Sequence, residues 1–295
     1  MTVAGPAGGM RFCYNIFDIA IYLLYHFPVK DGDLIIGIMA SFAPRRFGAG
    51  ELAALARPCG VTAASVRTSL SRLTARGVII RDKDGGKSVY GFSAKGLTIT
   101  GNVAAGFHRP DWTGWDGTYW GIAFSLPAAA KSERYRLTKK LSLFRFAPLY
   151  PGYWIRPCRE REKMEKKLEN VFSNPHCTAV RFHPWRPLDN DKIEAMWSLN
   201  AVATSLRAAD RTAEAALQRL KNTPPERAFA QRYATGGKIV SALFRDPLLP
   251  PAFLPRGWPA DRLRGLFTKF DAAALRLSRP FWESVLGKGG DDDHH

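Results

Sequence analysis

Residues 60–77 read Gly60-Val-Thr-Ala-Ala-Ser-Val-Arg-Thr-Ser-Leu-Ser-Arg-Leu-Thr-Ala-Arg-Gly77. Thr62 can cap the N-terminus of a helix, because its hydroxyl can accept a hydrogen bond from a first-turn amide. The glycine that closes the stretch suits the position just after the last helical turn. Apolar residues recur at helical spacing between these two signals, and they are Val66, Leu70 and Leu73. The stretch therefore predicts a helix with one narrow apolar stripe.

The rest of the predicted helix surface carries small, hydroxyl-bearing or basic side chains, and none of them is acidic. Such a surface can approach the bases and phosphates in a DNA groove closely. The candidate DNA contacts in this stretch are Thr62, Ala64, Ser65, Arg67, Thr68, Ser71 and Arg72.

The flanking segments complete a recognisable arrangement. Residues 49–57 have helical spacing and stop at Pro58, and Gly60 supplies a turn, so helix, turn and helix follow one another. Residues 78–81 and 88–92 are β-prone, and Asp84-Gly85 between them predicts a hairpin turn. The sequence thus predicts a winged helix-turn-helix. An ordinary helical hairpin beside a β-ribbon in an unrelated fold is the alternative.

The predicted wing adds two basic residues near its tip. Lys83 and Lys87 would meet DNA phosphates there, so both join the candidate DNA contacts.

Charge and composition agree with a polyanionic partner. The chain has 295 residues, 46% of them hydrophobic, and a formal net charge of +17, which favours nucleic acid, acidic lipid or a phosphorylated ligand. Of the segments 1–118, 119–190 and 191–295, the second has the largest excess of basic residues, with 14 basic and 6 acidic side chains. They could contact flanking DNA, line a pocket for a phosphorylated ligand, or be an ordinary solvated surface.

Cysteine spacing and hydropathy argue against metal-binding, secreted and membrane-spanning classes of protein. The four cysteines form no CxxC pair, so reduced thiols are expected. His176, Cys177 and His183 could bind a metal, but buried or surface roles are the simpler interpretation, and we expect neither a metal nor a cofactor. The chain shows no signal peptide and no apolar run long enough to span a membrane, which predicts a cytoplasmic protein.

The remaining chain divides into further regions. Helices are expected at 12–27 and 33–42, and a Trp- and Gly-rich linker at 106–117. Strands and helices then alternate at 119–126, 131–144, 153–156, 159–172 and 178–183, which predicts a ferredoxin-like domain. Three long helices follow at 192–220, 225–244 and 259–276.

The predicted fold class is therefore α+β, with three domains and a tail. They are a winged helix-turn-helix at 1–105, a ferredoxin-like α/β middle domain at 118–190, an all-helical C-terminal domain at 191–286 and a flexible tail at 287–295.

The order of these segments resembles the PaaX family of bacterial transcriptional regulators over nearly the whole chain. In the first half the resemblance rests on residues 66–73, Gly77, Ser88-Val-Tyr90 and Trp115-Asp-Gly117. In the second half it rests on Trp197-Ser-Leu199, Glu226-Arg-Ala-Phe229, Arg245-Asp-Pro-Leu-Leu-Pro250, Leu254-Pro255 and Trp258. The second set is specific in both order and spacing.

The resemblance implies a homodimeric repressor that binds double-stranded operator DNA and is released by an aryl- or acyl-coenzyme A ester, such as phenylacetyl-CoA. Such an effector needs cations for its phosphates and an apolar slot for its acyl group. The candidates that offer both are Trp154, Arg156, Arg227, Arg245 and Trp258. For each, a packed aromatic beside a structural arginine is the alternative.

Two other classes of function compete with the repressor. A metal-dependent nuclease built on the ferredoxin-like domain would need an aspartate at the end of its first strand, but that strand ends Phe124-Ser-Leu-Pro127 and Asp116 lies before it. We therefore expect no enzyme activity. A basic RNA-binding or scaffolding protein that uses its winged helix for protein contacts is the third possibility.

Overall fold

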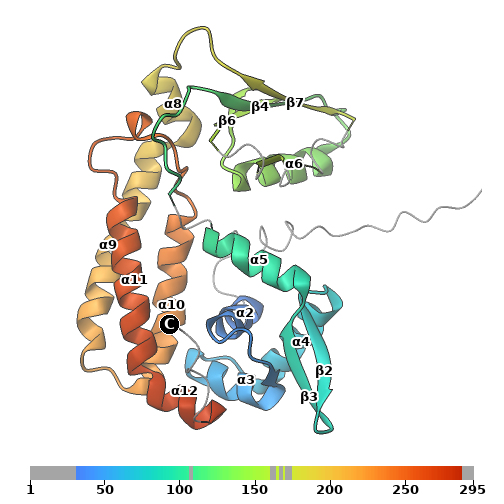
Figure 1. Cartoon of the computed structure of the whole chain (residues 1–295), viewed down its shortest axis with the longest axis vertical. Helices are drawn as coiled ribbons and strands as arrows, with labels where there is room; N and C mark the ends of the chain where they lie inside the picture. The colour runs from blue at the N-terminus through green and yellow to red at the C-terminus, as the bar shows by residue number, and fades with distance from the viewer. Residues whose placement is uncertain (1–30, 106–108, 160–163, 166–168, 170–174, 288–295) are drawn as a thin grey trace, which may run out of the picture.

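The computed structural model describes residues 31–105, 109–159, 164–165, 169 and 175–287 (Figure 1). The helix expected at 12–27 lies outside the described residues, as do nearly all of the tail and most of the helix expected at 159–172. The rest is a mixed helix and sheet structure with two antiparallel sheets.

The N-terminal region is a cluster of helices followed by a hairpin. Its elements are α2 (Asp31–Ser41), β1 (Phe47–Gly48), α3 (Ala49–Ala56), η1 (Arg57–Cys59), α4 (Ala63–Ala75), β2 (Ile79–Asp84), β3 (Lys87–Phe92) and α5 (Ala94–Ala105). The first sheet has the order β1-β3-β2. The predicted helices at 33–42, 49–57 and 62–76 are confirmed. The hairpin is followed directly by α5, a helix of 12 residues.

The turn of the hairpin lies one residue later in the chain than predicted. Asp84 pairs with Lys87 across the strands, so Gly85 and Gly86 form the two-residue loop, with φ of 53° and 79°. A tight turn that needs positive φ at both central positions favours two glycines over Asp-Gly. The strands are correspondingly longer than expected and bring Lys87 into β3.

The middle region is a four-stranded antiparallel sheet of order β5-β6-β4-β7, with α6 across one face (Figure 1). Its elements are β4 (Tyr119–Phe124), α6 (Lys131–Leu143), β5 (Ala147–Tyr150), β6 (Tyr153–Pro157) and β7 (Cys177–Phe182). The sequence prediction missed β5, a short strand that contains Pro148 and is bulged between Pro148 and Tyr150. An edge strand tolerates proline because one side of its backbone makes no ladder bonds.

Three long helices stack side by side in the C-terminal region. The elements are α8 (Asn190–Trp197), α9 (Leu199–Leu220), α10 (Pro225–Leu243), η2 (Pro251–Phe253), α11 (Ala260–Leu277) and α12 (Arg279–Leu286). The prediction of one helix over 192–220 is wrong. Ser198 adopts φ 50°, ψ 48° and breaks it, and the Glu194 carboxylate accepts a hydrogen bond from the Asn200 amide at the start of the next helix. Sequence analysis also missed α12, which follows α11 after Ser278.

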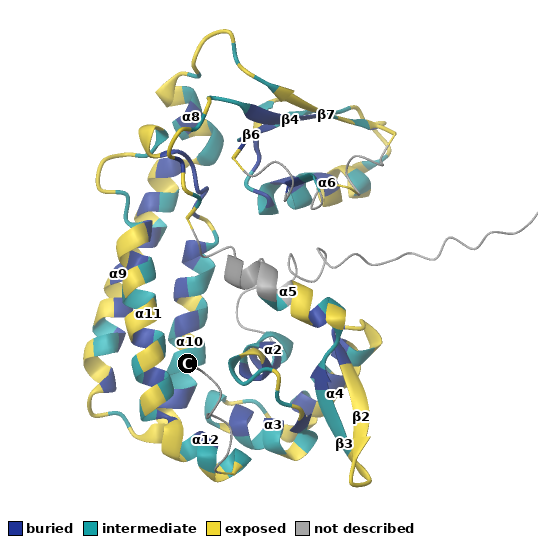
Figure 2. Ribbon diagram, viewed as in Figure 1, coloured by how far each residue is buried: buried dark blue, intermediate teal, exposed yellow. Residues whose placement is uncertain are grey.

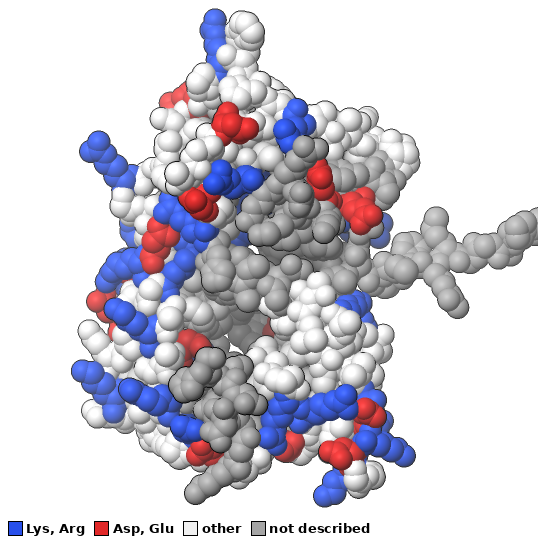
Figure 3. All heavy atoms as spheres, in the orientation of Figure 1, with Lys and Arg blue, Asp and Glu red and all other residues white. Residues whose placement is uncertain are grey.

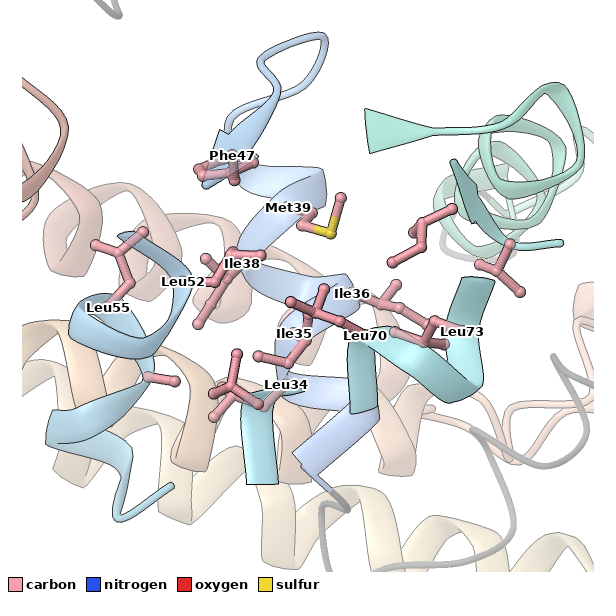
Figure 4. Close-up of a cluster of buried hydrophobic side chains, with 14 of the residues drawn as sticks. Leu34, Ile35, Ile36, Ile38, Met39, Phe47, Leu52, Leu55, Leu70 and Leu73 are labelled. Carbon is pink, nitrogen blue, oxygen red and sulfur yellow. The ribbon is translucent and has the colours of Figure 1, made fainter. Parts of the chain in front are cut away.

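The largest N-terminal core includes side chains from the far end of the chain. It forms around α2, whose apolar residues meet Leu52, Leu55 and Leu70 (Figure 4). Phe229 of α10 and Trp282 of α12 are buried in the same cluster, and Figure 2 shows buried residues in α2, α3 and α10 in dark blue. The N-terminal and C-terminal regions therefore stabilise one another by burial of shared apolar surface.

Within the described ranges, no helix is both long enough and apolar enough to cross a membrane.

Candidate DNA-binding surface

Helix α4 presents the surface expected from its sequence. Thr62 is the N-cap, and its hydroxyl oxygen accepts a hydrogen bond from the Ser65 amide at 3.2 Å. Val66, Leu70 and Leu73 are buried against the core that α4 shares with α2 and α3. The side turned away from this core is exposed and carries Ala64, Arg67, Thr68, Ser71 and Arg72.

Besides Thr62, two further predicted contacts use their hydroxyl groups within the protein. Ser65 is only half-exposed, and its hydroxyl donates a short hydrogen bond to the carboxylate of Asp31 at the start of α2. Its side chain is thus turned toward α2, away from the exposed face. Thr68 donates to the carbonyl of Ala64, 3.1 Å away, but remains on the exposed face.

The arginines of the exposed face are available to an outside partner. Neither Arg67 nor Arg72 forms an ion pair with any residue that the structure describes. Since α4 has no acidic residue, these charges are not neutralised within the helix. An uncompensated guanidinium is suited to phosphate oxygens or to the acceptor edge of guanine.

The hairpin supplies further cations beside acidic residues. Lys83 and Lys87 are exposed at its end, where basic and acidic side chains lie together in Figure 3. Asp82 pairs with Arg46 at 2.6 Å. Its pKa lies below the usual value, mainly because the Lys83 amide donates a hydrogen bond to its carboxylate and also because of Arg46. Asp82 is therefore ionised and already partnered.

Sequence reasoning missed three basic residues in this region. The exposed Arg81 donates across the hairpin to the Ser88 hydroxyl, at 3.0 and 2.7 Å. Arg46 lies before β1 and reaches the hairpin only through the fold, and Lys95 of α5 donates to the carbonyl of Arg76 at the end of α4. Arg81 could have been found from its place in the predicted wing. The other two are brought here by tertiary packing.

Helix α10 contacts the N-terminal unit through polar groups as well as apolar ones. The Arg232 guanidinium donates to Asp271 of α11 at 2.8 and 3.0 Å, and to Ser41 at the end of α2 at 2.7 Å. The Tyr233 hydroxyl donates to the same serine at 3.1 Å. Burial raises the pKa of Tyr233 above its ordinary value, so this phenol stays protonated at neutral pH.

The candidate effector residues occupy different places in the structure. Trp154 and Arg156 lie on β6, where Trp154 packs on the middle core and Arg156 donates to the Phe144 carbonyl at 2.8 Å. Arg227 is exposed in the first turn of α10, whereas Arg245 is exposed just beyond its last turn. These two arginines are separated by about 27 Å of helix, from the rise of 1.5 Å per residue.

Trp258 contacts the buried Asp246, whereas the exposed Arg245 beside it in the chain donates to the Ser205 hydroxyl of α9 at 3.5 Å. The Asp246 carboxylate accepts hydrogen bonds from the Trp258 indole and the Leu248 amide, each at 3.2 Å, and forms a short ion pair with Arg264. The carbonyl of Asp246 accepts from Arg145 of the middle region at 2.9 Å. Asp246 therefore fixes the proline-rich loop after α10 and connects the middle region to the C-terminal region. Because Trp258 donates to this carboxylate, it has a structural role.

A small cavity of about 190 Å³ lies at the start of the middle sheet. Trp115, Asp116, Cys158, Arg159 and Arg181 are among the residues that line it. Each arginine has an acidic neighbour, Asp111 at 3.8 Å from Arg159 and Asp116 close to Arg181. The cavity thus carries little net charge.

The position of Asp116 bears on the nuclease alternative. It lies in the turn before β4, and its carboxylate accepts a hydrogen bond from the Thr118 amide at 2.9 Å, which is the main reason that its pKa is lowered. Among the described residues, no three of the side chains of His, Cys, Asp and Glu gather as a metal ion would need.

The fold and this surface define a mixed helix and sheet protein with an exposed, basic helix, which follows a turn and precedes a hairpin. Three consecutive segments of the sequence each match a domain of one family. The matches are PaaX-like protein over residues 34–96, PaaX protein central Cas2-like domain over 113–193 and PaaX-like protein C-terminal domain over 197–284. The chain therefore belongs to the PaaX family.

Two relatives support this assignment. The chain is 27% identical over 276 residues to the transcriptional repressor PaaX of Escherichia coli strain K12, covering 88% of this chain and 87% of that protein. It also resembles the solved structure of the uncharacterized protein Rv0674 from Mycobacterium tuberculosis, with a TM-score of 0.60 and 21% identity over 84% of this chain and 97% of that one. The second likeness concerns the fold alone.

Proposed function

We propose that this chain is a cytoplasmic transcriptional repressor that binds operator DNA as a homodimer through a winged helix-turn-helix. The observation that carries the proposal is the exposed face of α4, which combines two arginines with short side chains and has no acidic residue. In this proposal α4 enters the major groove and the β2–β3 hairpin is the wing that contacts phosphates. The repressor named among its relatives supports the same function.

The middle region fits the expected ferredoxin-like fold in its strand order. Numbered along the chain, the four strands lie in the order 2-3-1-4, all antiparallel, with α6 on one face. We propose that this domain connects the wing-bearing region to the C-terminal helices and does not catalyse a reaction.

A dimer is proposed because a single winged helix contacts too few base pairs for selective binding in a genome, whereas two-fold symmetry doubles the site. Light scattering of the full chain tests this directly. A dimer gives about twice the chain mass of 32.8 kDa, and a mass of one chain both free and on DNA contradicts it.

The effector in this proposal is an acyl- or aryl-coenzyme A ester. Arg245 and Trp258 lie where the middle and C-terminal regions meet, so a ligand there could act on both. Trp154, Arg156 and Arg227 remain candidates, although the first two lie on β6 and Arg227 lies at the opposite end of α10 from Arg245. Release from DNA requires the ester to bind the DNA-incompetent conformation more tightly, because equal affinity for both states shifts nothing.

The experiment begins with selection of duplexes from a random pool by the full-length protein. The selected duplex is then used in gel shifts with a panel of coenzyme A esters and with the free acids as controls. The proposal expects a selected, two-fold symmetric sequence, with release by an ester and not by its free acid. Selection of no sequence contradicts the DNA-binding function, whereas selection without release by any ester contradicts the effector alone.

A further inference from the structure

Helix α6 of the middle region is strongly basic, with five basic residues and one acidic residue in thirteen. Leu137 and Leu141 are buried against the sheet and fix which side of the helix is turned inward. By helical periodicity, Tyr135 and Lys139 lie on the opposite side. Basic residues therefore reach the outer surface of this helix.

The acidic residue lies on the other side. Glu133 is half-buried, and both it and Lys140 act electrostatically on the Cys177 thiol of β7, where burial is the main cause of a raised pKa. Both side chains are thus turned toward the sheet. The outer surface of α6, defined here as Lys131, Tyr135, Arg136 and Lys139, contains no acidic member.

An aromatic ring stands among these cations. Tyr135 is 60% exposed, and the Lys139 ammonium lies over its ring at 5.4 Å from the centroid. A single exposed aromatic side chain is common on protein surfaces and does not by itself indicate a partner. Arg, Lys and Tyr side chains are all among those that form hydrogen bonds to the phosphates of a DNA duplex.

The place of α6 in the fold suits a DNA duplex that extends past α4. Figure 1 shows α6 and the β2–β3 hairpin on the same side of the long helices α9, α10 and α11. The outer surface of α6 and the exposed face of α4 both lack acidic residues. A polyanion is the partner that this charge distribution selects.

We propose that the outer surface of α6 is a second DNA-contact site, which binds the phosphate backbone on either flank of the sequence that α4 reads. This inference rests on the proposed DNA-binding function. The contact is independent of sequence and adds affinity only when the duplex is long enough to reach the middle region.

The test compares two lengths of the same selected duplex. The shorter one spans only the contacts of α4 and the hairpin, and the longer one extends by about two helical turns on each side. In the double variant Arg136→Gln/Lys139→Gln, we expect roughly tenfold weaker binding of the long duplex and a salt slope lower by about two units. Binding of the short duplex should not change.

A matched control separates this contact from a general loss of charge. Arg219→Gln/Lys221→Gln removes the same charge from exposed positions at the end of α9 and should leave both duplexes unaffected. Equal affinity and salt slope of wild type and the α6 variant on the long duplex overturn the inference, whatever the short duplex shows. A changed oligomeric state of the α6 variant with unchanged DNA binding also overturns it, because the surface would then serve a protein partner. A wild-type protein that binds neither duplex overturns the proposed function and this inference together.

Discussion

The Arg232 guanidinium of α10 lies 2.7 Å from the Ser41 hydroxyl, to which it donates a hydrogen bond at the last residue of α2. The same guanidinium is paired with Asp271 of α11. Helix α2 shares its core with α4, so this contact connects the C-terminal helices to the exposed basic face. A displacement of α10 would therefore reach the proposed DNA-binding surface through packed and hydrogen-bonded groups.

The Arg232–Asp271 pair should contribute strongly to stability. Arg232 is only 10% exposed, and Asp271→Ala leaves its charge without its carboxylate partner. We expect the free energy of unfolding to fall by about 2–4 kcal/mol in denaturant titrations, because breaking a buried pair from one side is costly. As a control, Glu283→Ala removes the more exposed Arg279–Glu283 pair of α12 and should cost less than about 1 kcal/mol. Equal losses in the two variants would show that Arg232 does not depend on Asp271.

Substitutions of two threonines, one at the N-cap of α4 and one on its exposed face, should distinguish an effect on stability from an effect on DNA binding. Thr62→Ala removes the N-cap hydrogen bond and should lower the free energy of unfolding by about 1 kcal/mol, whereas Thr62→Ser should retain most of it. Thr68→Ala should leave stability unchanged within about 0.5 kcal/mol, since the residue is exposed. It should still weaken binding of the selected duplex. Loss of stability in Thr68→Ala comparable to that in Thr62→Ala would contradict this division.

Local signals in the sequence predicted α4 well, whereas its surroundings depended on contacts that no local pattern contains. The cap at Thr62 and the stripe Val66, Leu70 and Leu73 determine the helix and its buried side. By contrast, Ser65 was expected to face DNA, but Asp31 of α2 accepts its hydrogen bond. The sequence distance between these two residues hides the contact from any periodicity argument.

The break at Ser198 could not be predicted for a similar reason. Serine is not a residue that usually stops a helix, and its positive φ persists because the helices before and after it are held by other contacts. One of them is made at the end of α8, where the Trp197 indole donates to the Arg145 carbonyl at 3.0 Å. The effector candidates were chosen by pairing nearby arginines and aromatics, but Arg227 and Arg245 lie at opposite ends of α10. An arginine and an aromatic residue that are close in the sequence therefore do not identify one shared site.

Asp246 should be essential for the junction between the middle and C-terminal regions. Its side chain is only 3% exposed and is bonded to Arg264, Trp258 and the Leu248 amide. Asp246→Ala should lower the free energy of unfolding by about 3–5 kcal/mol, because several buried donors lose their acceptor. Glu214→Ala, which removes an exposed partner of Arg262, should cost less than about 1 kcal/mol. Similar costs for the two variants would mean that Asp246 does not organise the loop.

Stability should fall at alkaline pH through Cys59 in the turn before α4. Burial raises the pKa of this thiol from 9.0 to about 11. Its folded-state pKa lies above the unfolded value, so the stabilising contribution is complete below pH 9 and is lost as the pH rises toward 11. Between pH 8 and pH 11, the free energy of unfolding of Cys59→Ala should fall by about 1–2 kcal/mol less than that of the wild type. This figure allows for the partial exposure of the thiol. Identical alkaline losses would show that this thiol does not ionise on unfolding.

The central claim is that α4 reads the DNA sequence and that the hairpin contacts the backbone. It is tested most directly by measuring the binding free energies of Arg72→Ala and Lys87→Ala for the selected duplex and for random duplexes. We predict that Arg72→Ala weakens the selected duplex by about 1–3 kcal/mol more than random duplexes, because a base contact is lost. Lys87→Ala should weaken all duplexes equally and lower the salt slope by about one unit. Equal weakening of selected and random duplexes by Arg72→Ala would contradict the claim.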